Sequence, residues 1–305
     1  MSRPRARGIA QSVQARLQAK ADREARPYAE LLQLFGIERF LYRLARSKHH
    51  DSLILKGAYL LKLWLGLDSR PTRDIDFLGP LGVDEQAVRL LLTDVVETEV
   101  ESDGLELDAE SLVVRRIRPG SPVHGMRAKF DGYLGRSRIR FQVDVGLGDA
   151  VTPQPVEVQI ESLLDLPVAS LKAYTLYSMV AEKLEALAFL GVETSRMKDI
   201  YDLLVLPREL AFDGVELTAA IRATFDKRQS SVSKALEILR ENGELQKKTV
   251  LWNSFLGKSH LEERTSLQEA VGKIRAFVEP PASAVVGDQP FVLHWPPGGP
   301  WQESR

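Results

Sequence analysis

The chain of 305 residues contains no cysteine, so disulfide bonds and thiolate metal sites are both excluded. It also has no long hydrophobic run, because the apolar stretch from Leu60 to Leu67 is far shorter than a membrane span and contains Lys62. No apolar segment of the kind found in a secretory signal follows the N-terminal arginines. With 44% hydrophobic and 27% charged residues, these absences predict a cytoplasmic globular protein without a membrane segment.

Common catalytic signatures are missing as well. Neither the G-x-S-x-G pattern of serine hydrolases nor the G-x-x-x-x-G-K-[ST] phosphate loop occurs. The five histidines are scattered, and none has metal-ligand spacing with another ligand.

The net charge of −1 conceals three blocks of charge. Residues 1–50 hold 11 basic and 4 acidic residues, residues 81–113 hold ten acids against one arginine, and residues 114–140 hold eight bases against one aspartate. Such blocks can be patches that attract a polyanion, or solvated faces that balance one another within the fold.

Hydrophobic periodicity predicts helices first, then an α/β middle with antiparallel strands, then helices again. The predicted helices are 11–26 (exposed and basic), 28–47, 84–97, 174–190, 195–206, 215–228, 231–240 and 262–277, and a strand or turn followed by a helix is predicted within 53–67. The predicted strands are 74–78, 110–118, 126–134, 139–147 and 156–160. The chain is helical from Ser170 onward in this interpretation.

Four segments follow from these patterns: basic N-terminal helices (1–50), an α/β core (51–168), a helical C-terminal part (169–279) and a tail (280–305). The tail is rich in proline, which predicts no regular structure there. Its two tryptophans indicate that it docks on a surface of the protein.

Asp74 and Asp76 are two residues apart in a predicted strand, so both carboxylates leave the same face while Ile75 and Phe77 enter the core. Their separation along the strand is roughly 6–7 Å. Hard oxygen donors at this spacing suit magnesium, which prefers carboxylates together with substrate phosphates. Each aspartate considered alone is more often a surface residue than a metal ligand.

A third carboxylate is expected from a neighbouring strand. Asp144 is the candidate, because it lies on the polar face of the strand 139–147, in which apolar residues strictly alternate. An aspartate is intrinsically unfavourable in the middle of a strand, which favours a functional reason for it. The other interpretation is a solvent-facing residue on a half-exposed strand.

Residues upstream of the aspartates suit a triphosphate. Gly57 begins a predicted helix, where backbone amides can approach phosphate, and Lys56 adds a positive charge. Arg70 and Thr72 offer a guanidinium and a hydroxyl just before the aspartates. A plain turn is the simpler explanation of Gly57.

The segments Leu55-Lys56-Gly57-Ala58 and Arg70-Pro-Thr-Arg-Asp-Ile-Asp76, followed much later by Arg196-Met-Lys-Asp-Ile-Tyr-Asp202, resemble the nucleotidyltransferase toxins of the AbiEii/AbiGii family, which include MenT-type toxins. The resemblance extends from about residue 12 to about residue 275 and includes the lysine-bearing helix around Lys183. One departure is Ala58, because related enzymes commonly have serine after this glycine.

This resemblance implies an α+β fold with a DNA polymerase β-like nucleotidyltransferase core, a mixed or antiparallel sheet, N-terminal helices and a helical C-terminal part. It implies a nucleoside triphosphate (NTP) substrate, Mg2+ or Mn2+ as cofactor, a cognate antitoxin as partner, and transfer of nucleotide to RNA, in several relatives the 3′ end of tRNA. Asp74, Asp76 and Asp144 would bind the metal.

The resemblance also assigns roles in the helical part. Lys183, Arg196 and Lys198 would bind the triphosphate together with Lys56, Gly57, Arg70 and Thr72, and Asp199 would order Lys183 or activate the acceptor hydroxyl. Without the resemblance, Lys183 reads equally well as a surface lysine, and the acids near 199–202 as ordinary residues of a helix N-terminus with one ion pair.

Three alternatives keep part of this hypothesis. The acceptor is a protein hydroxyl rather than RNA, or the chain is a nucleotide-binding regulator without transfer activity, or it is a transferase that is not toxic.

Overall fold

The computed structural model describes residues 4–66, 70–117, 125–191, 195–240, 244–259, 261 and 263–303. The chain divides into two compact units, and each is described separately below. The first unit comprises Met1–Gly148 and Val156–Ala173, and the second comprises Asp149–Pro155 and Tyr174–Arg305. No helix among the described residues is both long and apolar enough to cross a membrane.

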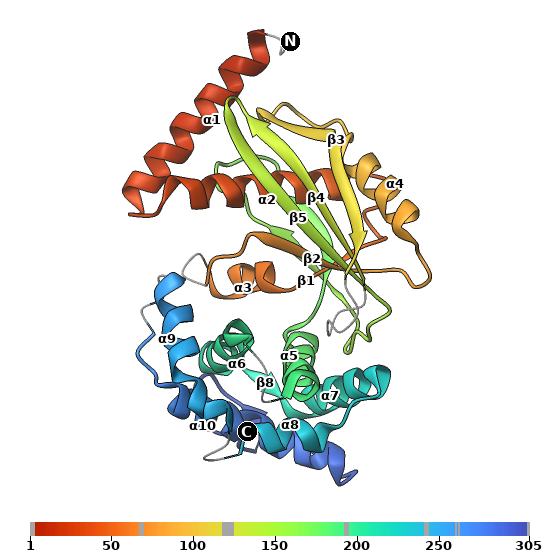
Figure 1. Cartoon of the computed structure of the whole chain (residues 1–305), viewed down its shortest axis with the longest axis vertical. Coiled ribbons are helices and arrows are strands. Elements are labelled where there is room, and N and C mark those ends of the chain that lie inside the picture. Colours follow the sequence, from red (N-terminus) through yellow and green to blue (C-terminus); the bar gives the residue numbers. More distant parts are fainter. Residues whose placement is uncertain are drawn as a thin grey trace. The chain divides into compact units, whose positions relative to one another are not determined.

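The first unit combines helices with one mixed sheet (Figure 1). Its helices are α1 (Pro4–Arg23), α2 (Tyr28–Arg46), α3 (Ala58–Leu65) and α4 (Glu85–Val96). Its strands are β1 (Ile54–Lys56), β2 (Asp74–Gly79), β3 (Leu105–Arg116), β4 (Gly125–Leu134), β5 (Ser137–Leu147), β6 (Val156–Ile160) and β7 (Ala169–Ala173). Within the described residues these seven strands form a single sheet in the order β3-β4-β5-β2-β1-β7-β6.

Neighbouring strands of this sheet pair antiparallel except for two parallel pairs, β2 with β5 and β1 with β7. A parallel pair needs a crossover connection, and the chain between β2 and β5 supplies one that contains α4 and the β3–β4 pair. The mixed α+β fold predicted from the sequence is confirmed.

One face of the β4–β5 pair forms the core of the first unit. Phe130 of β4 and Phe141 of β5 stack with ring centroids 4.7 Å apart, and Phe40 of α2 packs on both rings at 5.5 and 6.1 Å. Gly36 lets α2 approach closely, because a Cβ there would lie 3.0 Å from Ile139 and 3.1 Å from Phe141. The alternation predicted for 139–147 is therefore a real division between a buried and a polar face.

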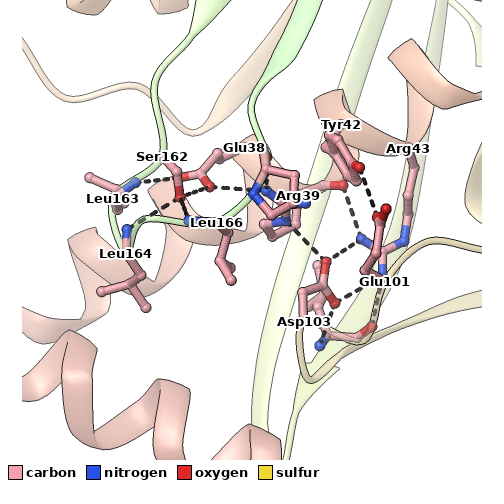
Figure 2. A network of polar contacts seen from close by, with 12 residues as sticks. Glu38, Arg39, Tyr42, Arg43, Glu101, Asp103, Ser162, Leu163, Leu164 and Leu166 are labelled. Carbon is pink, nitrogen blue, oxygen red and sulfur yellow. Dashed lines mark hydrogen bonds and ion pairs between the residues drawn. The ribbon is translucent and has the colours of Figure 1, made fainter.

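Figure 2 shows a buried network of polar contacts that ties α2 to two loops. Asp103 receives hydrogen bonds from Arg39 Nε at 3.0 Å and from both terminal nitrogens of Arg43, at 2.8 and 3.1 Å. Glu38 accepts hydrogen bonds from the Ser162 hydroxyl and the Leu163 amide, each at 2.8 Å. Because every charge meets an opposite charge or a polar partner, these groups can lie in the interior.

Most predicted elements of the first unit are confirmed, with three corrections. Helix α1 begins at Pro4 rather than Gln11, and it is not exposed all round because Leu17 is fully buried. Strand β3 begins at Leu105, earlier than predicted, and residue 118 of the predicted strand lies outside the described residues. The segment Ala169–Ala173 is strand β7 rather than helix. The overlooked signal in the sequence is the alternation of Ala169, Leu171 and Ala173, which point inward, with Ser170 and Lys172.

The second unit is mainly helical. Its elements are α5 (Leu176–Leu190), α6 (Met197–Glu209), β8 (Phe212–Asp213), α7 (Gly214–Arg228), α8 (Val232–Ile238), a 3-10 turn η2 (Glu244–Lys248), α9 (Thr249–Lys258), α10 (Leu267–Val286) and β9 (His294–Trp295). Helix α9 and the small β8–β9 pair were not predicted.

The tail contradicts the prediction that it has no regular structure. Helix α10 continues through Pro280 and Pro281 to Val286, and His294–Trp295 pairs with β8. Pro281 has no amide hydrogen to donate to the carbonyl of Phe277, and the Trp301 indole donates to that carbonyl instead at 2.8 Å. The tryptophan thus satisfies a group that the proline leaves open.

The predicted docking of the tail on the protein is confirmed. Trp295 is buried, and its indole donates to the Pro207 carbonyl at 2.7 Å. Phe277 packs against both tail tryptophans, with ring centroids 5.1 Å from Trp295 and 5.7 Å from Trp301. The tail therefore belongs to the core of the second unit.

Candidate functional site

The candidate catalytic carboxylates of the first unit lie on the two adjacent parallel strands β2 and β5. Asp76 and Asp144 are direct register partners, and Asp74 is paired with Gln142. Register partners place their side chains on the same face, about 4.8 Å apart across the sheet. Ile75 and Phe77 are fully buried on the other face, as predicted. The structure therefore brings all three predicted aspartates to one face of the sheet.

Strand β1 borders the other side of β2 and brings Lys56 and Gly57 to Asp76. Lys56 is the register partner of Asp76 and is buried. Gly57 has a φ of +73°, and a Cβ on it would lie 2.1 Å from Asp76 Oδ2. Only glycine is compatible with that conformation and that close approach. The first role of this glycine is thus to make room for the Asp76 carboxylate directly before α3.

Arg127 on β4 holds the third carboxylate. It is the register partner of Asp144, and its Nε and Nη2 donate to the two carboxylate oxygens at 2.8 and 2.6 Å. The hydrogen bond from Arg127 to Asp144 is the main reason why the pKa of the guanidinium is raised, and Asp74 and Asp76 add to it. The Arg127 side chain is 44% exposed and that of Asp144 is 14% exposed. The arginine therefore fixes the direction of Asp144 from the solvent side.

The donor chemistry of this face fits a divalent cation. Among the described residues no group of three carboxylate or imidazole side chains converges tightly enough to hold a metal ion by itself. Both oxygens of Asp144 accept hydrogen bonds from Arg127. Mg2+ commonly takes one or two carboxylates and completes its shell with substrate phosphates and water. Asp74 and Asp76 fit that pattern as a pair of oxygen donors beside a glycine.

Thr72 and Arg70, which the sequence analysis assigned to phosphate binding, lie in different environments. Thr72 donates its hydroxyl to the Asp74 carbonyl at 3.1 Å, so it holds the start of β2. Arg70 is buried, with 8% of its surface exposed.

A second set of predicted residues forms a charged cluster within the second unit. The Lys183 ammonium on α5 lies 3.1 Å from Asp199 Oδ1 and 2.5 Å from Asp202 Oδ2, both on α6. Arg196 Nε lies 2.7 Å from Asp199 Oδ2. Lys183, Asp199 and Asp202 are all buried. The ion pair of Asp202 is with Lys183 rather than with its helical neighbour Lys198, which is exposed.

The protein family described as nucleotidyl transferase AbiEii toxin, type IV TA system, matches residues 39–275. This chain belongs to the AbiEii family. It is accordingly a nucleotidyltransferase, and its family consists of toxins of type IV toxin–antitoxin systems. The match spans the aspartates of the first unit and the lysine–aspartate cluster of the second.

One solved structure supports the fold of this AbiEii chain. A protein from H. pylori that was assigned as a nucleotidyltransferase has a TM-score of 0.51 at 14% identity, over 84% of this chain and 96% of its own. JHP933 from Helicobacter pylori has a TM-score of 0.47 at 14% identity, over 83% of this chain and 92% of its own. No curated protein matches the chain.

Arg127 is the residue of this candidate site that the sequence interpretation of this AbiEii protein missed. The signal was present, because the predicted strands 126–134 and 139–147 form a hairpin whose turn contains Gly135 and Arg136. A turn there pairs Leu134 with Ser137, and counting outward along both strands places Arg127 opposite Asp144.

Proposed function

We propose that this AbiEii nucleotidyltransferase is a toxin that transfers a nucleotide from an NTP to the 3′ end of an RNA in the presence of Mg2+. The RNA acceptor in this proposal is a tRNA. The observation that carries the proposal is the register of β2 and β5, which aligns Asp76 with Asp144 beside Asp74. Three carboxylates on one polar sheet face form a suitable donor set for nucleotidyl transfer.

In this proposal Asp74 and Asp76 hold the cation, and Asp144 completes the site. The cation, when bound, neutralises the charge of the triphosphate and of the departing pyrophosphate. Asp144 accepts the proton of the attacking ribose hydroxyl, whose oxygen then forms the new bond to the α-phosphorus while pyrophosphate leaves. Arg127 keeps the Asp144 carboxylate directed until the substrate arrives, which the bidentate contact supports.

The basic residues of both units are assigned to the triphosphate. These residues are Lys56, Arg70, Lys183, Arg196 and Lys198, together with the Gly57 backbone and the Thr72 hydroxyl. Asp199 acts as a positioning residue for Lys183, as their 3.1 Å contact supports. Phosphoryl-type transfer depends mostly on such positioning and charge neutralisation.

A type IV toxin implies a cognate antitoxin, so an antitoxin protein is the expected partner of this chain. A cytoplasmic location remains part of the proposal, because tRNA and NTP are cytoplasmic substrates. Growth after induced expression, with and without the neighbouring gene, tests toxicity and its neutralisation. Unimpaired growth in both cases would favour a transferase that is not toxic.

The acceptor is tested by incubating the protein with each labelled NTP and total tRNA. We expect label on tRNA with the wild type and none with Asp76→Ala, while Glu110→Ala, an exposed carboxylate on β3, behaves as the wild type. Label on protein instead of tRNA would replace the RNA acceptor with a protein hydroxyl. Binding of NTP without release of pyrophosphate from any acceptor would contradict transfer altogether.

A further inference from the structure

The three-stranded part of the sheet formed by β3, β4 and β5 has two very different faces. One face packs on Phe40 of α2 through Phe130 and Phe141. Side chains alternate along a strand, so the residues between these point to the opposite face. On that face Lys129 of β4 and Arg140 of β5 are exposed. Antiparallel sheets commonly leave one face in solvent, and among the described residues this face carries long basic side chains that a partner can reach.

The strand register shows which residues share this open face. Arg115 of β3 pairs with Arg127, and Lys129 pairs with Gln142. Tyr133, with 37% of its surface exposed, pairs with Arg138 further along the same strands. We use the name basic sheet face for the following residues: Arg115, Lys129, Tyr133, Arg138 and Arg140.

Acidic groups on the same face already have partners, so they do not cancel the basic ones. Asp131 is paired with Arg138 at 2.5 Å. Asp108 accepts hydrogen bonds from the backbone amides of Glu110 and Ser111, at 3.0 and 3.2 Å. On β3 the face becomes acidic at Glu106, the register partner of Tyr133, which marks its limit.

The basic side chains, in contrast, are available to a ligand. Arg115 is 78% exposed on its side chain, and its ion pair with Glu85 is long, at 3.9 Å. Within the described part of the chain no carboxylate lies within ion-pair distance of Lys129 or Arg140. Arg138 keeps its ion pair with Asp131, so Arg115, Lys129 and Arg140 are the side chains of this face that can meet phosphate.

The basic sheet face is continuous with the candidate carboxylates. The row Arg115, Arg127, Asp144, Asp76 crosses β3, β4, β5 and β2 in register. From Arg127 to Tyr133 the strand extends about 20 Å. That length corresponds to roughly six stacked nucleotides at ~3.4 Å for each phosphate. A stacked single strand can therefore lie along β4 and β5 with one end at the aspartates.

We propose that the basic sheet face binds the phosphodiester backbone of the single-stranded 3′ segment of the acceptor RNA and directs its terminal hydroxyl to Asp144. Lys129, Arg140 and Arg115 contact phosphates, and Tyr133 stacks on a base. The inference rests on the proposed function, in which RNA is the acceptor. It adds the surface, the direction and the single-stranded character of the bound segment.

The test measures binding of a fluorescein-labelled single-stranded RNA by anisotropy, over a range of salt concentrations, with the full chain. The variant is Lys129→Gln/Arg140→Gln. The matched control is Arg89→Gln/Lys273→Gln, which removes the same charge from exposed positions on α4 and α10. Binding of NTP is measured in parallel and reports an intact fold.

We expect the Lys129→Gln/Arg140→Gln variant to bind the RNA at least about fivefold more weakly at low salt, with the slope of log K against log salt reduced by about 1.4. Its KM for tRNA in the transfer reaction should rise with little change in kcat, and NTP binding should persist. Tyr133→Leu should weaken binding without changing the salt slope, because stacking carries no charge.

Three results would overturn the inference. If the wild type labels tRNA and the variant binds RNA as tightly as the control, the basic sheet face does not bind the RNA, and the proposed function is unaffected. A wild type that neither binds nor labels RNA would contradict both the RNA-binding surface and the proposed function. Unchanged RNA binding together with lost binding of poly-glutamate assigns the surface to an acidic protein partner.

Discussion

Asp76 and Asp144 occupy the same register position on the parallel strands β2 and β5, although 67 residues lie between them in the chain. Parallel pairing fixes both carboxylates on one face without any local sequence relationship between them. Gly57 on one side and Arg127 on the other then constrain the two carboxylates. The predictions below test each of these constraints.

Gly57→Ala should reduce nucleotide transfer by about a hundredfold, because the new Cβ would displace the Asp76 carboxylate. Gly66→Ala is the matched control. Gly66 also has a positive φ, of +80°, yet among the described residues no atom lies within 4 Å of its Cβ position. Both variants should lose about 1–2 kcal/mol of stability from the strained backbone, measured by urea unfolding. Equal activity of the two variants would show that Gly57 does not position Asp76.

Arg127→Ala should lower kcat for nucleotide transfer by roughly 10- to 100-fold, because Asp144 loses both of its hydrogen-bond donors. Arg127→Lys should recover part of the rate, since it restores the charge but not the bidentate geometry. Arg222→Ala, which removes another exposed ion pair, serves as the control. The half-saturating Mg2+ concentration should change in Arg127→Ala only. A rate and Mg2+ dependence equal to the wild type would exclude a positioning role for Arg127.

Lys183→Met should destabilise the protein by about 3–5 kcal/mol, because two buried carboxylates would lose their shared positive partner. Adding Asp202→Asn removes one of these charges and should recover much of the stability. Transfer activity should stay lost in the double variant, since the triphosphate has lost its lysine. Chemical unfolding and transfer assays separate the two effects. Recovery of activity together with stability would make Lys183 a purely structural residue.

Asp103→Asn should cost about 3 kcal/mol at neutral pH, because it breaks the buried pairs with Arg39 and Arg43 shown in Figure 2. Burial acts to raise the pKa of Asp103, but the Arg43 and Arg39 contacts and the Leu105 amide outweigh it and lower the pKa below 3.8. A lowered folded pKa means that the stabilisation is present above the unfolded pKa and is lost as the pH falls through the folded value.

The wild type should therefore lose this contribution only below about pH 4, and Asp103→Asn should lack that part of the acid transition. Asp165→Asn, at a fully exposed side chain, is the control. Unfolding free energies measured from pH 7 to pH 3 test the prediction. Parallel curves for wild type and Asp103→Asn would contradict it.

Local signals in the sequence predicted the parts of the fold that depend on local physics. The alternation in 139–147 predicted β5 and the polar position of Asp144, and the position of Gly57 before an apolar run predicted the start of α3. The β4–β5 hairpin also contained enough information to place Arg127 opposite Asp144. Each of these inferences needs only periodicity or one turn.

Other features depend on contacts between distant segments. No local pattern aligns β2 with β5, because their register is set by the packing of the whole sheet. Likewise, Pro280 and Pro281 predicted the end of a helix, whereas Trp301, twenty residues further along, provides the donor that lets α10 continue. Tertiary contacts overrode the local preference in that case.

The central claim is that Asp76 and Asp144 act together in nucleotide transfer to RNA, and a single-turnover rate measurement with labelled NTP and tRNA tests it most directly. Asp76→Asn, Asp144→Asn and the double variant are compared with the wild type. Each single variant should lose roughly 10³-fold or more, and the double variant should lose little beyond that, because the two carboxylates act as one unit. A wild-type rate in Asp144→Asn, or losses that multiply in the double variant, would contradict the account.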